Sequence, residues 1–412
     1  VRGNETGIFV SYATSTQFTT ALNNTIYDNR VGIELRAYGR FGSSVDAIGN
    51  QIFGNDTGIF ASGGSSLYNG FSGTIRDNLI YANVDYAIEI GNAYPGTSVV
   101  GNTIHKASGD AIHVKDLSYA IDFRDNVFSV LEGFVFRFEA DSQVGHTSDY
   151  NLFDLGTAGK VADLSWTHVA SYEDWFYEAG FDAHGKVGDP QFVDPDGADD
   201  ILGFFSETIG NPVIIDDGDA GFSTIGNWTT VDNGYLADSR VATKASDLAV
   251  WEFSDLEPAG YYQLAATVPY VSYSPNDARF YIYADGAVVG APRMDQSYFR
   301  SFDFVDGGVG WDELGMYRAG ADGKLRIELH GGDGSYDRWA SADAVRLQPA
   351  LVNMGKDDNF HLKIGSIALD AGDPNSDASA EPIPNGSRVN LGAYGGTTTA
   401  TYSPTVESLH VD

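Results

Sequence analysis

Three side chains capable of acid–base or ionic chemistry recur at one regular spacing in the first third of the chain, and a fourth lies beside them. Glu89, His113 and Arg137 follow one another at equal intervals (113 − 89 = 24 and 137 − 113 = 24), and Lys115 lies two positions after His113. Removing a proton next to a carboxylate, as a lyase or epimerase does, needs a base and a cation that neutralises the acid. We therefore name Glu89, His113, Lys115 and Arg137 as catalytic candidates, with His113 or Lys115 as the base and Arg137 as the neutralising cation.

Aromatic and charged residues precede this set at a similar spacing. Phe9, Glu34 and Phe60 occupy the equivalent positions, and Arg36 lies two after Glu34. Aromatic rings stack on sugar rings, and guanidinium groups pair with anions, so these four are carbohydrate-binding candidates. A glycoside hydrolase would instead need two carboxylates, and Glu34 and Glu89 would be about 10 Å apart if they lie two repeats apart. A solvated surface without a ligand is the alternative to all three interpretations.

A repeat of short segments must position these residues. The pattern Asn-x-apolar-x begins at six positions: Asn24, Asn50, Asn78, Asn102, Asn126 and Asn151. A second pattern, small-apolar-x-apolar, follows as in Gly32-Ile-Glu-Leu and Ala87-Ile-Glu-Ile. Three short alternating segments per repeat predict a solenoid with one strand on each side, stacked about 4.8 Å from its counterpart in the next turn. We interpret the Asn column as structural, because stacked amides can hydrogen-bond along it.

Residues 1 to about 155 resemble the right-handed parallel β-helix proteins of the pectin-lyase-like superfamily. Three later blocks, 188–195, 359–372 and 381–396, resemble the closing coils of large secreted bacterial β-helix proteins. In such relatives the first two blocks lie close together, whereas here Val193 and Phe360 are 167 residues apart (360 − 193 = 167). The resemblance implies a secreted or cell-surface bacterial protein with a polysaccharide partner. Because residue 1 falls inside a repeat, we expect the chain to be covalently part of a longer protein.

The intervening residues 212–349 alternate apolar and polar positions between Gly turns, which predicts an antiparallel β-sandwich. Segments such as Trp251–Tyr261 and Ser341–Arg346 resemble the golvesin-like, xanthan-lyase-associated carbohydrate-binding-type domain. That resemblance implies sugar binding. Trp251 and Trp311 lie in alternating strands and are expected in the core. Four aromatic residues nearer the predicted loops are carbohydrate-binding candidates: Trp228, Tyr270, Tyr273 and Trp339.

The charge of the chain excludes several classes of partner. Its 412 residues include 24 Lys and Arg against 57 Asp and Glu, for a formal net charge of −33. Nucleic acids and anionic membranes attract basic surfaces, so neither is expected as a partner, and no apolar run is long enough for membrane insertion. The absence of Cys excludes a disulfide scaffold, a thiolate metal site and a Cys nucleophile. No phosphate-binding or dinucleotide-binding Gly motif occurs, so no organic cofactor is expected.

Two acidic loops have the hard oxygen ligands that Ca²⁺ prefers. The first offers Asp194, Asp196 and Asp199, and the second offers Asp216, Asp217 and Asp219. Ordinary Asp and Gly turns are the alternative for both loops.

Together these patterns predict an all-β chain: a right-handed parallel β-helix solenoid interrupted near its C-terminal end by an antiparallel β-sandwich. The expected domains are a β-helix over 1–200, the inserted sandwich over 212–349, and a return to closing coils over 350–412. The leading functional hypothesis is an extracellular polysaccharide-interacting module. A polysaccharide lyase or glycoside hydrolase acting on an acidic glycan, and a structural rod of an adhesin-like surface protein, remain as alternatives.

Overall fold

The chain divides into two compact units, one made of residues 1–205 and 353–412 and the other of residues 206–352. The computed structural model describes residues 1–12, 18–37, 44–64, 70–267, 269, 274–275, 277–297, 302–331 and 339–404. Helical structure in this part of the chain is confined to short pieces: α1 (Tyr172–Asp174), η1 (Trp175–Ala179), η2 (Gly197–Asp199) and η3 (Tyr235–Ala237). No helix among the described residues is both long enough and apolar enough to cross a bilayer.

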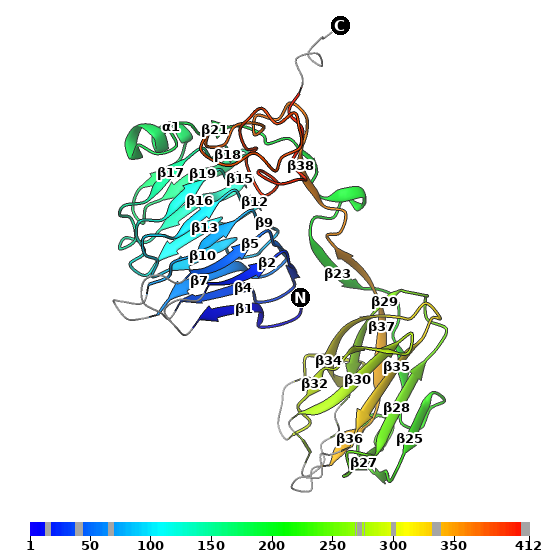
Figure 1. Ribbon diagram of the computed structural model, residues 1–412. Helices are drawn as coiled ribbons and strands as arrows, with labels where there is room; N and C mark the ends of the chain where they lie inside the picture. The colour runs from blue at the N-terminus through cyan, green and yellow to red at the C-terminus, as the bar shows by residue number, and fades with distance from the viewer. Residues whose placement is uncertain are drawn as a thin grey trace. The chain divides into compact units, whose positions relative to one another are not determined.

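The first unit is a parallel β-solenoid of about six turns with three sheets, as the repeat predicts (Figure 1). The first sheet runs β1 (Thr6–Tyr12), β4 (Val31–Ala37), β7 (Thr57–Gly63), β10 (Ile88–Gly91), β13 (Ile112–Lys115), β16 (Glu132–Phe138), β19 (Ala158–Asp163) and β20 (His168–Val169). The second runs β2 (Phe18–Leu22), β5 (Ser44–Ile48), β8 (Thr74–Arg76), β11 (Ser98–Val100), β14 (Asp122–Arg124) and β17 (Thr147–Asp149). The third runs β3 (Thr25–Tyr27), β6 (Gln51–Phe53), β9 (Leu79–Tyr81), β12 (Thr103–Lys106), β15 (Val127–Val130), β18 (Leu152–Asp154) and β21 (Lys186–Val187).

Stacked apolar side chains fill the inside of the solenoid. Ile33, Ile59, Ile88 and Ile112 occupy successive positions of the first sheet in register, and all four are fully buried. Since side chains alternate along a strand, the residue after each of them points outward. The small residue before each Ile lies where neighbouring turns approach closely. A Cβ added at Gly32 would come within 2.5 Å of the Gly58 carbonyl oxygen.

The Asn column lies at the bend between the second and third sheets. Each side-chain amide donates to the amide oxygen one turn further on, at 2.9 to 3.0 Å, from Asn24 through Asn151. The last acceptor is the carboxylate of Asp182, which Asn151 reaches at 2.9 Å. Backbone N–H groups in the column also donate to these oxygens, as Asn78 does to Asn102 at 3.0 Å. The chain of amides therefore satisfies polar groups that the fold buries.

A short irregular segment covers one end of the apolar core. Trp175, which belongs to η1, is 2% exposed and stacks on Phe136 with ring centroids 5.5 Å apart. Its indole N–H donates to Asp182 at 2.9 Å. The residue that ends the Asn column thus also fixes the side chain that closes the core.

After β38 (Asn359–Leu362), which pairs with β22 (Phe192–Asp194), residues 363–404 contain turns and no strand. We expected closing coils here. Instead the segment packs apolar residues such as Ala371 and Leu391 against Leu79 and Val127 of the third sheet. The difference has a local cause, because this Gly-, Pro- and Asp-rich segment lacks the alternating apolar positions of a strand.

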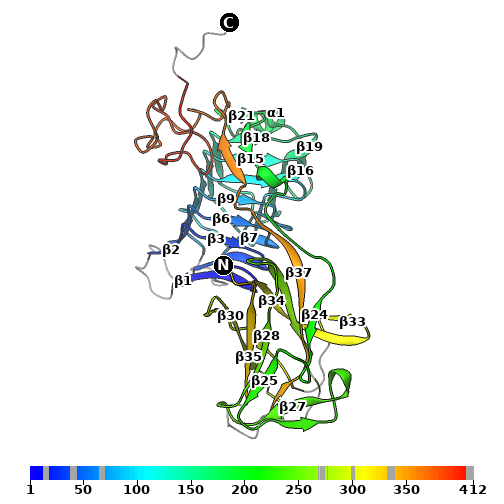
Figure 2. The same cartoon turned by 90° about the vertical axis from the view of Figure 1, so that its right-hand side faces the viewer.

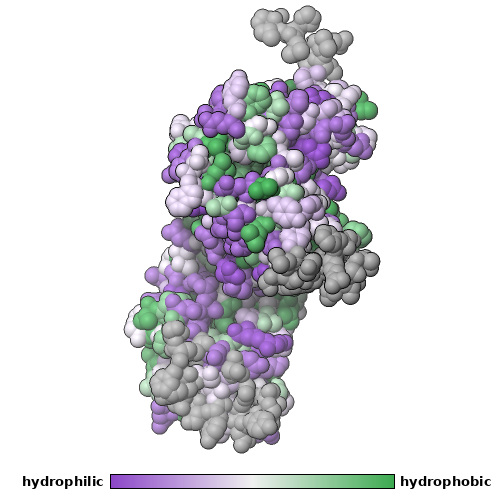
Figure 3. Space-filling model, turned by 90° about the vertical axis from the view of Figure 1, so that its left-hand side faces the viewer, coloured by the Kyte–Doolittle hydropathy of each residue, from purple (hydrophilic) through white to green (hydrophobic). Residues whose placement is uncertain are grey.

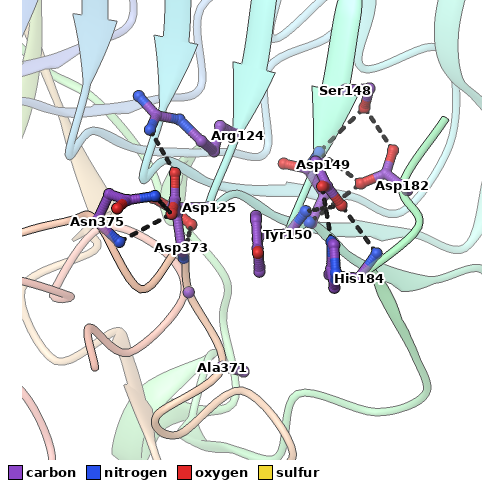
Figure 4. Close-up of polar contacts among 12 residues, drawn as sticks. Arg124, Asp125, Ser148, Asp149, Tyr150, Asp182, His184, Ala371, Asp373 and Asn375 are labelled. Atoms are coloured by element: carbon purple, nitrogen blue, oxygen red, sulfur yellow. Dashed lines mark hydrogen bonds and ion pairs between the residues drawn. The ribbon is translucent and has the colours of Figure 1, made fainter. Parts of the chain in front are cut away.

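Single polar contacts anchor this closing segment (Figure 4). Arg124 Nη1 donates to Asp373 at 2.8 Å, and the Asp373 backbone N–H donates to Asp125 at 2.7 Å. Nearby, His184 Nδ1 lies 2.9 Å from Asp149 and stacks on Tyr150. These side-chain contacts hold turns that have no hydrogen-bonded strand pairing of their own.

The second unit is an antiparallel sandwich, reached along β23 (Phe204–Thr208) and left along β37 (Val345–Met354); Figure 2 shows its strands. One sheet contains β23, β37, β29 (Tyr261–Ala266), β34 (Val309–Arg318) and β33 (Phe304–Asp306), with β24 (Val213–Ile215) beside β37. The other contains β25 (Phe222–Ile225), β28 (Leu248–Phe253), β35 (Leu325–His330), β30 (Ala278–Ala284) and β31 (Ala287–Gly290), with β32 (Arg293–Met294) beside β30. A small third sheet contains β26 (Thr229–Val231), β27 (Ser239–Ala242) and β36 (Ala340–Ala342).

The sandwich core lies between the two larger sheets. Trp251 and Phe280 from one sheet pack in a single apolar cluster with Leu264 and Leu347 from the other. Trp251 and Trp311 are each 1% exposed, which confirms their prediction as core residues.

Candidate functional site on the first sheet

The predicted outward positions of the first sheet form one column. Strand pairing aligns Phe9 with Glu34, Glu34 with Phe60, Phe60 with Glu89, Glu89 with His113, and His113 with Arg137. A neighbouring column aligns Ser11, Arg36, Ser62, Gly91 and Lys115 in the same way. The structure thus brings eight of the predicted site residues to one face of six successive parallel strands, from β1 to β16.

Charged groups on this face pair with each other, either within one strand or across neighbouring strands. Lys115 Nζ lies 2.9 Å from Glu89, and Arg36 Nε lies 2.7 Å from Glu34. Both cations also lie over the Phe60 ring, at 4.6 Å for Arg36 and 5.9 Å for Lys115. Phe60 therefore presents a ring flanked by two cations, whereas Phe9, one strand beyond Glu34, is 55% exposed.

His113 is the most enclosed polar group of the column, with 8% of its surface exposed. Its Nδ1 lies 3.4 Å from Glu89 and its Nε2 lies 3.4 Å from Glu139. The ring also packs on Tyr86, with centroids 4.7 Å apart. An imidazole with a carboxylate at each nitrogen can donate to both only in its protonated form.

The pKa values of Glu89 and Lys115 determine whether either group can act as an acid or a base. Burial opposes ionisation of Glu89, but hydrogen bonds from His113 and Lys115 outweigh it and lower the pKa of Glu89 below its usual value. Burial opposes the charge of Lys115, but its hydrogen bond to Glu89 outweighs this and raises the pKa of Lys115. Glu89 is therefore a carboxylate and Lys115 an ammonium at neutral pH. This argues against Lys115 as the predicted base.

Two residues of this face were missed by the sequence analysis. Arg137 Nη1 donates to Asp110 at 3.0 Å, and the hydrogen bond to Asp110 raises the pKa of Arg137. Asp110 and Tyr86 both lie in turns just before a strand, where the alternating pattern carries no information on facing. Their sequence signal is the place directly before the recurrent small-Ile pair.

The predicted aromatic candidates of the sandwich lie in the other unit. Trp228 is half-buried against the sandwich core, and Trp339 is half-buried beside β36. Tyr270 and Tyr273 lie outside the described residues.

The acidic loops differ from each other. Asp194 lies in β22, Asp196 precedes η2, and the Asp199 carboxylate accepts the Ile201 backbone N–H at 3.0 Å, so this loop forms ordinary turns. In the second loop, Asp219 accepts the Asp216 N–H at 3.0 Å and is exposed. Within the described part of the chain, one acidic group brings three carboxylates within 4.8 Å of one another: Asp216, Asp217 and Asp238.

A cavity of about 230 Å³ opens between the second sheet's edge and the closing segment. Its lining includes Arg76, Asp77, Asp125 and Asn390. Burial raises the pKa of Asp77 to about 6, although Arg76 opposes the shift. None of the predicted site residues lines it. On the side of the molecule drawn in Figure 3, hydrophilic residues are interspersed with smaller apolar areas.

Comparison with known proteins agrees with the solenoid fold. No curated protein matches this chain. Among solved structures, a Paenibacillus xanthan lyase is 23% identical over 33% of this chain and 13% of its own, with a TM-score of 0.27. A variant tailspike of E. coli bacteriophage HK620, solved with a pentasaccharide, is 12% identical over 84% of this chain and 60% of its own, with a TM-score of 0.26.

A β-(1,4)-mannanase from Podospora anserina is 17% identical over 41% of this chain and 32% of its own, with a TM-score of 0.22. This chain thus spans less than two thirds of each of these three proteins. The family comparison is more direct, because residues 1–128 match the model of the right-handed β-helix region.

Proposed function

We propose that the outward face of the first sheet binds an extended polysaccharide chain. The observation that carries the proposal is the register of the column from Phe9 to Arg137, in which aromatic and charged groups follow one another strand by strand. Strand spacing of about 4.8 Å repeats such groups at intervals comparable to one sugar residue of an extended glycan. A linear polymer could therefore make similar contacts on successive turns.

The chemistry of the face fits a ligand with both ring faces and anionic groups. Phe60 offers a ring for stacking, and Lys115, Arg36 and Arg137 keep donors beside it. Each of these cations is already paired with a carboxylate. In each pair the cation is the more exposed partner, so a uronate or sulfate could reach it from solvent and share it with the protein carboxylate.

Isothermal titration calorimetry with the full chain tests this proposal. Oligogalacturonates of increasing length would be the anionic probes and cello-oligosaccharides the neutral ones. We expect affinity to grow with length, and Phe60→Ala to weaken binding about tenfold through lost stacking.

Phe18→Ala is the matched control, because Phe18 is a 74% exposed ring on the second sheet rather than the first. An equal loss of glycan affinity from both substitutions would contradict the proposal. So would a protein that binds no glycan on an array with a broad range of acidic polymers.

A second candidate function is polysaccharide cleavage by a lyase. The observation that favours it is His113, which lies between two carboxylates on the proposed binding face. An imidazole can accept or donate a proton through its ring nitrogens, and Arg137 could neutralise a substrate carboxylate. Incubation with acidic polysaccharides, followed by the ultraviolet absorbance of unsaturated uronate and by reducing ends, tests it. Product that disappears in His113→Ala supports cleavage, whereas binding without product supports the binding role alone.

We extend the proposal to the second unit as an accessory carbohydrate-binding domain of the golvesin-like type. The antiparallel sandwich and the buried Trp251 support that assignment. Trp228 and Trp339 remain its candidate sugar contacts. The same proposal places the protein at the bacterial surface or outside the cell, where polysaccharide chains are encountered. We expect Trp339→Ala to weaken glycan binding by the chain that already carries Phe60→Ala. If Phe60→Ala has the same effect with and without Trp339→Ala, the two units bind glycan independently.

A further inference from the structure

Three acidic side chains from two segments of the sandwich converge, two of them buried and the third, Asp238, half-buried. Asp216 and Asp217 follow β24, Asp238 immediately precedes β27, and their oxygens lie within 4.8 Å of one another. Asp216 and Asp217 are 4% and 2% exposed. Burying like charges this closely is strongly unfavourable unless a positive charge compensates them.

The protein's own groups do not complete this arrangement. Arg240 donates to Asp217 at 3.0 Å, which leaves three carboxylates against one guanidinium, or a formal charge of −2 (−3 + 1 = −2). Oδ1 of Asp216 and Oδ1 of Asp217 are buried without a hydrogen-bond partner. Unpartnered buried oxygens are uncommon in proteins, and each one calls for an explanation such as a bound ion.

Neighbouring groups add to the negative potential instead of relieving it. Asp343, between β36 and β37, is 3% exposed and accepts hydrogen bonds from Thr267 at 2.6 Å and from the Tyr235 backbone N–H at 3.0 Å. The Thr267 hydroxyl and the Tyr235 N–H are therefore already used by Asp343.

We propose that Asp216, Asp217 and Asp238 bind one calcium ion inside the sandwich. A divalent cation cancels the remaining formal charge of −2 and gives both unpartnered oxygens a ligand. Calcium fits better than magnesium, because it accepts many carboxylate oxygens in irregular geometry, whereas magnesium retains several of its waters. The ion would connect the turn after β24 to the start of β27, two segments that share no strand pairing in the described sheets.

The proposal is independent of glycan binding and of any activity on the first sheet. It also differs from the sequence-based expectation, since Asp238 takes the place of Asp219, and the loop of Asp194, Asp196 and Asp199 is not part of the site. Asp238 is therefore the position to substitute in the site, and Asp194 is the position to substitute as a control.

The test uses the full chain stripped with EDTA and then titrated with CaCl₂ or MgCl₂ in a calorimeter. Thermal unfolding is followed in parallel by tryptophan fluorescence, because four of the six Trp residues lie in the sandwich unit: Trp228, Trp251, Trp311 and Trp339. We expect one calcium per chain and a higher midpoint of sandwich unfolding. Asp238→Asn should weaken calcium binding about tenfold or more and abolish the rise in midpoint.

Asp194→Asn is the matched control and should behave as the unsubstituted chain. Circular dichroism in EDTA verifies that Asp238→Asn still folds, and Asp216→Asn provides a second variant of the same site. Retained calcium binding in both variants, loss of binding in Asp194→Asn, an equal response to magnesium, or no calcium response in any chain would each overturn the proposal.

Discussion

The buried amides of the Asn column in the solenoid and the buried aspartates after β24 in the sandwich follow opposite patterns. Asn102 in the solenoid is fully buried, donates to Ile75 at 2.8 Å and to Asn126 at 3.0 Å, and accepts from Asn78. Asp216 and Asp217 in the sandwich are almost as buried, yet each keeps one oxygen without a partner. The complete network is that of a structural column, whereas the two unpartnered oxygens are the ones that the proposed calcium ion would satisfy.

The largest effect should come from breaking the complete network. Asn102→Leu keeps a similar volume but leaves the Asn78 amide without its acceptor and the Ile75 carbonyl without its donor. We expect the free energy of unfolding of the solenoid to fall by about 2 to 4 kcal/mol. Denaturant unfolding followed by circular dichroism measures it, with the exposed Asn227→Leu as control. A loss below that of the control would refute the structural role of the column.

Exchanging amide and carboxylate should have opposite signs in the two regions. Asn126→Asp places a charge in a buried chain of amides and should destabilise the solenoid. Asp216→Asn removes a like charge from a crowded site and should stabilise the metal-free sandwich by about 1 kcal/mol. Unfolding in EDTA measures both. Equal signs would show that the comparison between the two regions is wrong.

The outward face of the first sheet should respond weakly in stability and strongly in binding. Glu89→Gln removes an ion pair that is partly exposed, so the free energy of unfolding should change by less than about 1 kcal/mol. Glycan affinity should nevertheless change, because Lys115 and His113 lose the carboxylate that orients them. Calorimetry with oligogalacturonate, next to a melting curve of the same variant, separates the two effects. A large loss of stability with unchanged affinity would make the face structural.

The last prediction concerns the pH dependence of stability. Burial raises the pKa of Asp77 to about 6, so the folded chain binds more protons than the unfolded chain between about pH 4 and 6. The contribution of Asp77 to solenoid stability is therefore present at low pH and is lost as pH rises through about 6. Asp77→Asn should flatten this part of the stability profile. If the free energy of unfolding of the variant depends on pH as in the unsubstituted chain, titrating groups other than Asp77 cause that dependence.

The outward column of the first sheet could be predicted from the sequence because strand alternation fixes facing and the repeat fixes register. Glu89 and His113 were found in this way. Asp110 and Tyr86 could not be, because turn residues have no fixed facing. Asp238 lies 21 residues after Asp217 (238 − 217 = 21), and only the folded sandwich brings them together.

The closing segment was harder to predict, because individual side chains rather than a repeating pattern place it. Arg124 and Asp373 are 249 residues apart in the chain and meet at 2.8 Å. A motif that resembles a closing coil does not specify whether its residues stack on the last turn or cover a sheet. The absence of alternation after Leu362 is the signal that favours a strand-free layer.

The amides of the Asn column all point the same way, from Asn24 toward Asp182. The column is thus a row of aligned dipoles with a defined head and tail. The Asp182 carboxylate accepts a hydrogen bond from Asn151 but has no side-chain N–H to donate to a further residue. It therefore ends the column. Duplicating the 24 residues from Asn102 to Asp125 would insert one more turn with every amide paired, whereas a turn added after Asp182 would find no donor to continue from.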